Sequence, residues 1–86
     1  MSVRAAIKLA DRLRQIREER FGPEGGPDLA RRLDIPARTW QNYEQGITIP
    51  GTILLAFLLE TNASPGWLAE GEGPRYCGPA DDRRPD

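Results

Sequence analysis

The chain has 86 residues, of which 38% are hydrophobic and 29% charged, and its net charge is −1. This length predicts one domain, and the composition is typical of a globular protein. The sequence contains no histidine and one cysteine, Cys77, which removes the commonest general base and metal ligand and excludes an internal disulfide or a zinc finger. We therefore expect no enzyme, and we predict no metal, cofactor or small-molecule ligand.

No apolar segment is long enough to cross a membrane. The longest unbroken apolar run covers residues 53–59, which is seven residues. A spanning helix needs about 20. The N-terminal residues also lack the apolar region of a signal peptide. We expect a cytoplasmic protein without a membrane partner.

The charge is distributed unevenly along the chain. Residues 1–49 contain nine basic and seven acidic side chains, whereas residues 50–86 contain three and six. The first half is net positive, and this is the sign of charge that DNA binding requires, since the phosphate backbone is anionic. The excess is too small to predict a nucleic-acid partner by itself.

The first predicted helix covers residues 5–20, which contain neither glycine nor proline. Leu9, Leu13 and Ile16 are spaced by four and three residues, so they share one face of this helix. A turn rich in glycine and proline follows. Pro27 suits the first position of a short second helix at about 27–33, with Gly26 as its N-cap.

Asp34 ends the second helix, at a position that often requires a left-handed backbone. Pro36 then opens a third helix at about 37–45, which Gly46 stops. Trp40 and Tyr43 are three residues apart and are expected to face inward.

The fourth predicted helix starts at Pro50 and is nearly all apolar to Leu59, so we expect it to be largely buried. Asn62 ends it. Ser64 and Pro65 then form the N-cap and first position of a short fifth helix, with Trp67 and Leu68 inside. Residues 1–74 are thus predicted to form a compact, irregular all-α domain of five helices, and residues 75–86 a C-terminal tail.

The second and third helices, joined by a tight turn, have the layout of a helix-turn-helix. Leu29, Ala30 and Leu33 bury the second helix, and the small Ala30 lets the third helix cross close to it. The outward residues of the third helix are Ala37, Arg38, Gln41, Asn42 and Gln45. Arginine suits the O6 and N7 atoms of guanine, and glutamine or asparagine suits adenine. The alternative is an ordinary solvated polar helix face.

Residues 29–33, Ile35, the aromatic Tyr43 before Glu44 and Gly46, and then Pro50 form an ordered set. With residues 12–19 and 67–73, this set resembles the lambda-repressor-like (Xre/Cro) family over about residues 9–73. The resemblance implies a compact five-helix fold whose third helix enters the major groove of double-stranded DNA, with a homodimer possible on a near-palindromic site. It implies a sequence-specific transcriptional regulator, most often a repressor.

The resemblance also implies roles for individual residues. The base-contacting positions would be Ala37, Arg38, Gln41 and Asn42. The positions near phosphates would be Gly26, Gln45 and Thr48. Arg17 and Glu44 match a pair that forms a buried salt bridge between the first and third helices, so their role would be architectural.

Three features depart from the family pattern: Gly26 replaces the usual glutamine, the first connection is longer, and Pro36 replaces a capping serine or threonine. Together with the net charge they support an alternative, a protein-interaction module that retains the fold with weak or no DNA binding. The salt dependence of DNA affinity distinguishes the two, because neutralising phosphates releases counterions.

Overall fold

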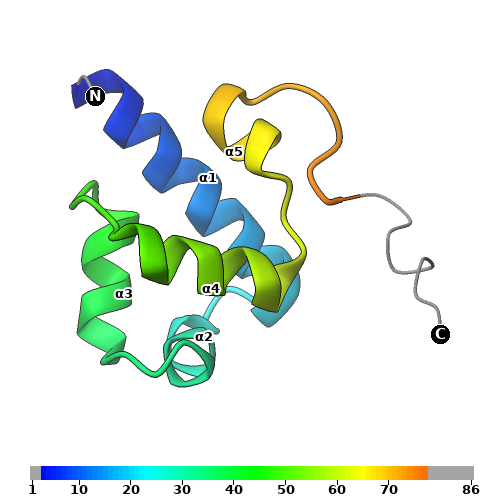
Figure 1. Ribbon diagram of the computed structural model, residues 1–86. Helices are drawn as coiled ribbons and strands as arrows, with labels where there is room; N and C mark the ends of the chain where they lie inside the picture. Colours follow the sequence, from blue (N-terminus) through cyan, green and yellow to red (C-terminus); the bar gives the residue numbers. More distant parts are fainter. Residues whose placement is uncertain (1–2, 78–86) are drawn as a thin grey trace, which may run out of the picture.

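The computed structural model describes residues 3–77, with side chains from Lys8 onward. Five helices occupy this range: α1 (Val3–Phe21), α2 (Gly26–Arg32), α3 (Ala37–Glu44), α4 (Gly51–Thr61) and α5 (Pro65–Glu70). The prediction of an all-α fold is confirmed (Figure 1). None of the helices seen here is both long and apolar enough to cross a bilayer.

Local signals in the sequence set several helix ends. Asp34 and Asn62 adopt left-handed conformations, with φ of 61° and 62°. This conformation was predicted for Asp34, whereas for Asn62 only the helix end was predicted. The Ser64 hydroxyl accepts a hydrogen bond from the Trp67 N–H at 3.3 Å, which confirms the predicted cap of α5. At α2 the N-cap is Gly25 rather than Gly26, so this helix begins one residue earlier than expected.

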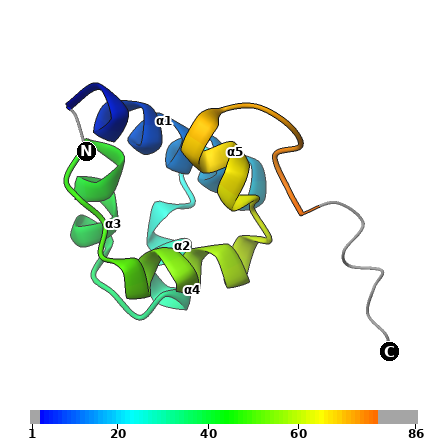
Figure 2. The same cartoon turned by 45° about the horizontal axis from the view of Figure 1, so that its top comes forward.

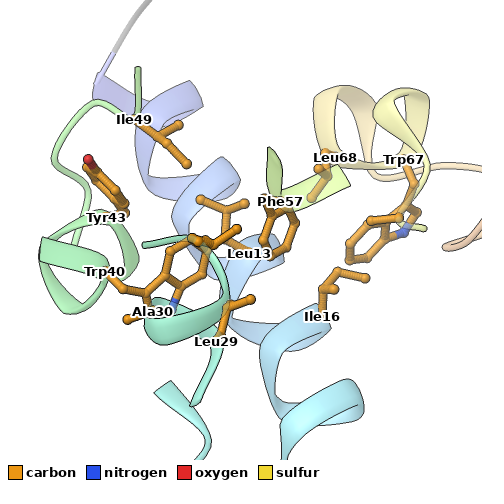
Figure 3. Packing of buried hydrophobic residues seen from close by; sticks show 12 residues of the cluster. Leu13, Ile16, Leu29, Ala30, Trp40, Tyr43, Ile49, Phe57, Trp67 and Leu68 are labelled. Carbon is orange, nitrogen blue, oxygen red and sulfur yellow. The ribbon is translucent and has the colours of Figure 1, made fainter. Parts of the chain in front are cut away.

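The core lies where the five helices meet, and Figure 3 shows its side chains converging from all of them. Trp40 stacks on Phe57 of α4 with ring centroids 5.2 Å apart, and Tyr43 meets Trp40 edge-on at 6.0 Å. Trp67 and Leu68 enter the core from α5. The inward orientation predicted for these aromatic residues is confirmed, and it fixes which side of α3 faces outward.

The expectation that α4 is largely buried is wrong for its outer side. Phe57 is fully buried, but Leu55 is 62% and Leu59 88% exposed. With 3.6 residues per turn, Leu55 and Leu59 lie on one side of the helix, away from Phe57. An apolar run thus predicts this helix, but the core of a domain this small covers only one side of it.

Residues 75–77, expected to begin a tail, lie against the α4–α5 connection. Tyr76 forms an isolated antiparallel bridge with Ala63, and two backbone hydrogen bonds of 2.9 Å flank it. The Tyr76 hydroxyl donates to the Glu19 carboxylate at 2.7 Å, and the Arg20 guanidinium lies 4.3 Å from the centroid of the tyrosine ring. The rest of the predicted tail, residues 78–86, lies outside the described residues.

Candidate nucleic-acid interface

Helices α2 and α3 pack against each other through a tight turn. The Ile35 N–H donates to the carbonyl oxygen of Ala30 at 3.0 Å, and the left-handed Asp34 reverses the chain between the helices. Ala30 is only 1% exposed. Its small side chain allows the close contact. Figure 2 shows α2 and α3 on the side of the molecule away from α5.

The outward side of α3 is polar and open to solvent. Its exposed residues are Ala37, Arg38, Gln41, Asn42 and, at the C-cap, Gln45. They recur at intervals of three and four residues, so they form one face opposite the buried Trp40 and Tyr43. Because a core aromatic pair anchors the other side of α3, the orientation of this face is fixed.

Arg38 differs from the neighbouring arginines of α2 in its partners. Arg31 forms an ion pair with Asp28, and Arg32 pairs with Glu60 of α4 at 3.0 Å. Within residues 3–77 no carboxylate lies within salt-bridge distance of Arg38. The positive charge of Arg38 is therefore available to an anionic or hydrogen-bond-accepting partner.

A buried ion pair ties α3 to α1. The Arg17 guanidinium makes a two-pronged contact with Glu44, from Nε to Oε2 at 2.9 Å and from Nη2 to Oε1 at 2.8 Å. The two side chains are only 9% and 11% exposed. The hydrogen bonds from Arg17 to Glu44 raise the pKa of the arginine above its ordinary value. Arg17 therefore stays protonated at any physiological pH.

The same two residues organise the long connection between α1 and α2. Arg17 Nη1 donates to the carbonyl oxygens of Gly22 at 3.0 Å and Pro23 at 2.8 Å. Trp40 Nε1 also donates to Glu44 Oε2. One arginine thus holds α1, the connection and α3 in a single hydrogen-bonded unit.

A depression of about 480 Å³ lies between this connection and α3. It brings Gly26 together with Ala37, Arg38 and Gln41, three of the expected base-contacting residues. Glu24, which the sequence analysis did not select, also lines this depression and is exposed. Its carboxylate adds negative charge beside the face of α3, and no sequence pattern indicated that it would lie there.

The other expected site residues lie elsewhere on α3 and beyond it. Asn42 of α3 and Gln45 at its C-cap are exposed but do not line this depression. Thr48 lines a different, mostly apolar cavity of about 150 Å³, together with Ile47 and Leu54. The expected phosphate contacts are therefore divided between two regions, with Gly26 in one and Thr48 in the other.

Gly25 is a structural residue that sequence reasoning missed. A Cβ atom at this position would lie 2.2 Å from the carbonyl oxygen of Phe21. The adjacent Gly26 has room, since a Cβ atom there would come no closer than 3.9 Å to Trp40 Cδ1. The paired glycines were the available signal, but the sequence analysis left Gly25 in the turn and gave a specific role only to Gly26.

The sequence matches no known protein family, no curated protein and no solved structure.

Proposed function

We propose that this chain is a double-stranded DNA-binding protein of the lambda-repressor-like class, which reads the major groove with α3 and acts as a transcriptional repressor. The observation that carries the proposal is the exposed set Arg38, Gln41 and Asn42 on a helix whose opposite side is locked into the core. These side chains offer the donors and acceptors that distinguish bases in the major groove.

The fixed position of α3 supports this role. Packing of Trp40 and the Arg17–Glu44 pair hold the helix from two directions, so its outer side chains are presented on a rigid element. Rigid presentation favours recognition, because little ordering is then required on binding. Gly26 and Thr48, in separate regions beside α3, would position the duplex through phosphates while α3 reads bases.

The proposal is tested by selecting binding sites from a random duplex library and measuring affinity at about 50 mM and 200 mM salt. Arg38→Ala and Asn42→Ala should each weaken binding to the selected site by about 1–3 kcal/mol. Arg14→Ala is a matched control, because it removes the same charge from an exposed position on α1 outside the α2–α3 pair. Equal losses for Arg38→Ala and Arg14→Ala would overturn the assigned recognition surface.

The second candidate is a protein-interaction module without DNA binding. Two observations favour it: Glu24 lines the same depression as Arg38, where a carboxylate would repel phosphates, and the net charge is −1. A folded protein that binds no duplex at either salt concentration would select this candidate over the first.

A further inference from the structure

The connection between α1 and α2 places an acidic side chain next to the outward face of α3. Glu24 is exposed, and it lines the depression of about 480 Å³ together with Ala37, Arg38 and Gln41. The connection is longer than in the family that the sequence resembles, and the resemblance gives no role to Glu24. Its position among three expected base-contacting residues therefore calls for an explanation from this chain itself.

The backbone of the connection is held on both sides of Glu24. On one side, Arg17 Nη1 donates to the carbonyl oxygens of Gly22 at 3.0 Å and Pro23 at 2.8 Å. On the other side, Gly25 is buried, and its N–H donates to the Gly22 carbonyl oxygen at 3.0 Å. The Glu24 side chain thus extends from a fixed backbone, so little ordering is required when its carboxylate meets a ligand.

The opposite charges of Glu24 and Arg38 line one depression without pairing. Within residues 8–77 neither side chain forms an ion pair, with the other or with a third residue. Arginine only donates hydrogen bonds, and an ionised carboxylate only accepts them. A ligand that suits this depression must therefore offer acceptors to Arg38 and an N–H donor to Glu24.

We propose that Glu24 reads a cytosine of the DNA site, by accepting a hydrogen bond from its N4 amino group in the major groove; this inference rests on the proposed function. Cytosine presents an amino donor in that groove, and guanine presents the O6 and N7 acceptors that suit Arg38. Because the two side chains line the same depression, the cytosine lies within one base-pair step of the base that Arg38 contacts.

The carboxylate also discriminates against other bases. Guanine and thymine present only acceptors in the major groove, so Glu24 would lose its hydration there without gaining a donor. Its charge likewise repels phosphates on any sequence. Such penalties give specificity by weakening the binding of wrong sites. Glu24 therefore lowers affinity on most sequences, and lowers it least where a cytosine amino group meets it.

The test selects a site from a random duplex library with the full chain, and then measures affinity with each of the four bases at every position. We expect a cytosine whose replacement weakens wild-type binding by about fivefold to tenfold. Glu24→Ala should remove the preference at that position alone. Glu24→Gln should extend it to adenine, because an amide suits the N6 and N7 atoms of adenine. Arg38→Ala should relax a position within one base-pair step.

N4-methylcytosine at the same position tests the contacting atom. In a duplex its methyl group replaces the amino hydrogen that faces the major groove, so wild-type binding should again weaken about fivefold to tenfold. Glu24→Ala should bind the methylated and unmodified duplexes equally. Glu24→Lys should tighten binding to duplexes in general through its charge, and should also lose the preference for cytosine.

Glu72→Gln is the matched control, because it removes the same charge from an exposed position beyond α5. This variant should keep the wild-type preference for cytosine. Urea unfolding verifies that all variants are folded, which is expected because Glu24 is exposed.

The outcomes separate this inference from the proposed function. A site at which Glu24→Ala relaxes no position, or one that Glu72→Gln relaxes equally, would overturn the inference and leave the proposed function in place. Unchanged wild-type affinity for the methylated duplex would do the same. A folded wild type that binds no duplex would overturn the proposed function, and this inference with it.

Discussion

At the scale of single residues, two adjacent glycines differ in what surrounds them. Gly25 is buried where the α1–α2 connection turns, and its N–H donates to the carbonyl of Gly22 at 3.0 Å. Gly26 lies in the first turn of α2, where an added Cβ atom would meet Trp40 at an ordinary contact distance. The first position requires the absence of a side chain, whereas the second does not.

Gly25→Ala should therefore destabilise the fold, because its Cβ would collide with the Phe21 carbonyl oxygen, 2.2 Å away. We expect a loss of about 1–3 kcal/mol, the usual cost of overpacking, measured by urea unfolding. Gly26→Ala is the control, and it should leave stability unchanged or raise it by up to about 1 kcal/mol through helix propensity. Equal stability of the two variants would show that the connection has room to move.

Glu24 is a second single residue with an expected effect, since its negative charge lies in the depression next to α3. Under the proposed function, Glu24→Lys should tighten DNA binding and increase the magnitude of the salt slope by up to about 0.9, the value for one added phosphate contact. Glu72→Lys makes the same charge change beyond α5. If both variants tighten binding alike, only overall charge matters and Glu24 has no local effect.

At the scale of elements, α3 is held against α1 by charge as well as by packing. The Arg17–Glu44 pair is nearly buried, and its carboxylate also accepts from Trp40. Removing one member leaves the other charge without its partner in a site that excludes most water. The pair therefore acts mainly to orient α3, because buried pairs add little net stability over apolar substitutes.

Arg17→Met should cost about 3–5 kcal/mol, because it strands the Glu44 carboxylate. The double variant Arg17→Met/Glu44→Leu should lose less than the single variant, since no buried charge is then left unpaired. Denaturant midpoints at constant slope measure both effects. Additive losses would mean that the two side chains contribute independently of each other.

At the scale of the whole molecule, the segment after α5 closes the structure back onto its first helix. Arg75 pairs with Glu19 and its guanidinium lies 5.0 Å from the centroid of the Trp67 ring. Tyr76 is held between Glu19 and Arg20. Since Arg20 Nε also donates to the carbonyl of Thr61 at 3.1 Å, this segment links α1 with the end of α4.

Tyr76→Ala should lower the free energy of unfolding by about 1–2 kcal/mol, because it removes a hydrogen bond and a cation–π contact at a half-buried site. Cys77→Ser, at the next and more exposed position, is the control and should change stability by less than about 0.5 kcal/mol. Thermal unfolding of the full chain compares them. An unchanged melting temperature for Tyr76→Ala would show that residues 75–77 contribute nothing to the fold.

The features predicted correctly from sequence are those with local causes. The left-handed turn at Asp34, the helix end at Asn62 and the Ser64 cap depend on residues within about one helical turn, and residue type signals them directly. The inward side of α3 follows from the spacing of Trp40 and Tyr43. The same spacing predicts the polar outward face of α3, which is the surface proposed to read DNA.

Other features depend on contacts between residues that are distant in sequence, and no periodic pattern of residues predicts such contacts. Glu19 meets Tyr76 across 57 positions. Glu24 and Arg38 line one depression, next to the connection that Arg17 bonds through the Gly22 and Pro23 carbonyls. Likewise, the sequence of an apolar helix does not indicate which of its sides will be covered by a neighbouring element. The sequence by itself determined the helices and the inward side of α3, because backbone conformation and periodicity act locally. Only the tertiary structure decided that Leu55 and Leu59 of α4 are exposed and which residues surround α3, because both depend on the elements that pack alongside.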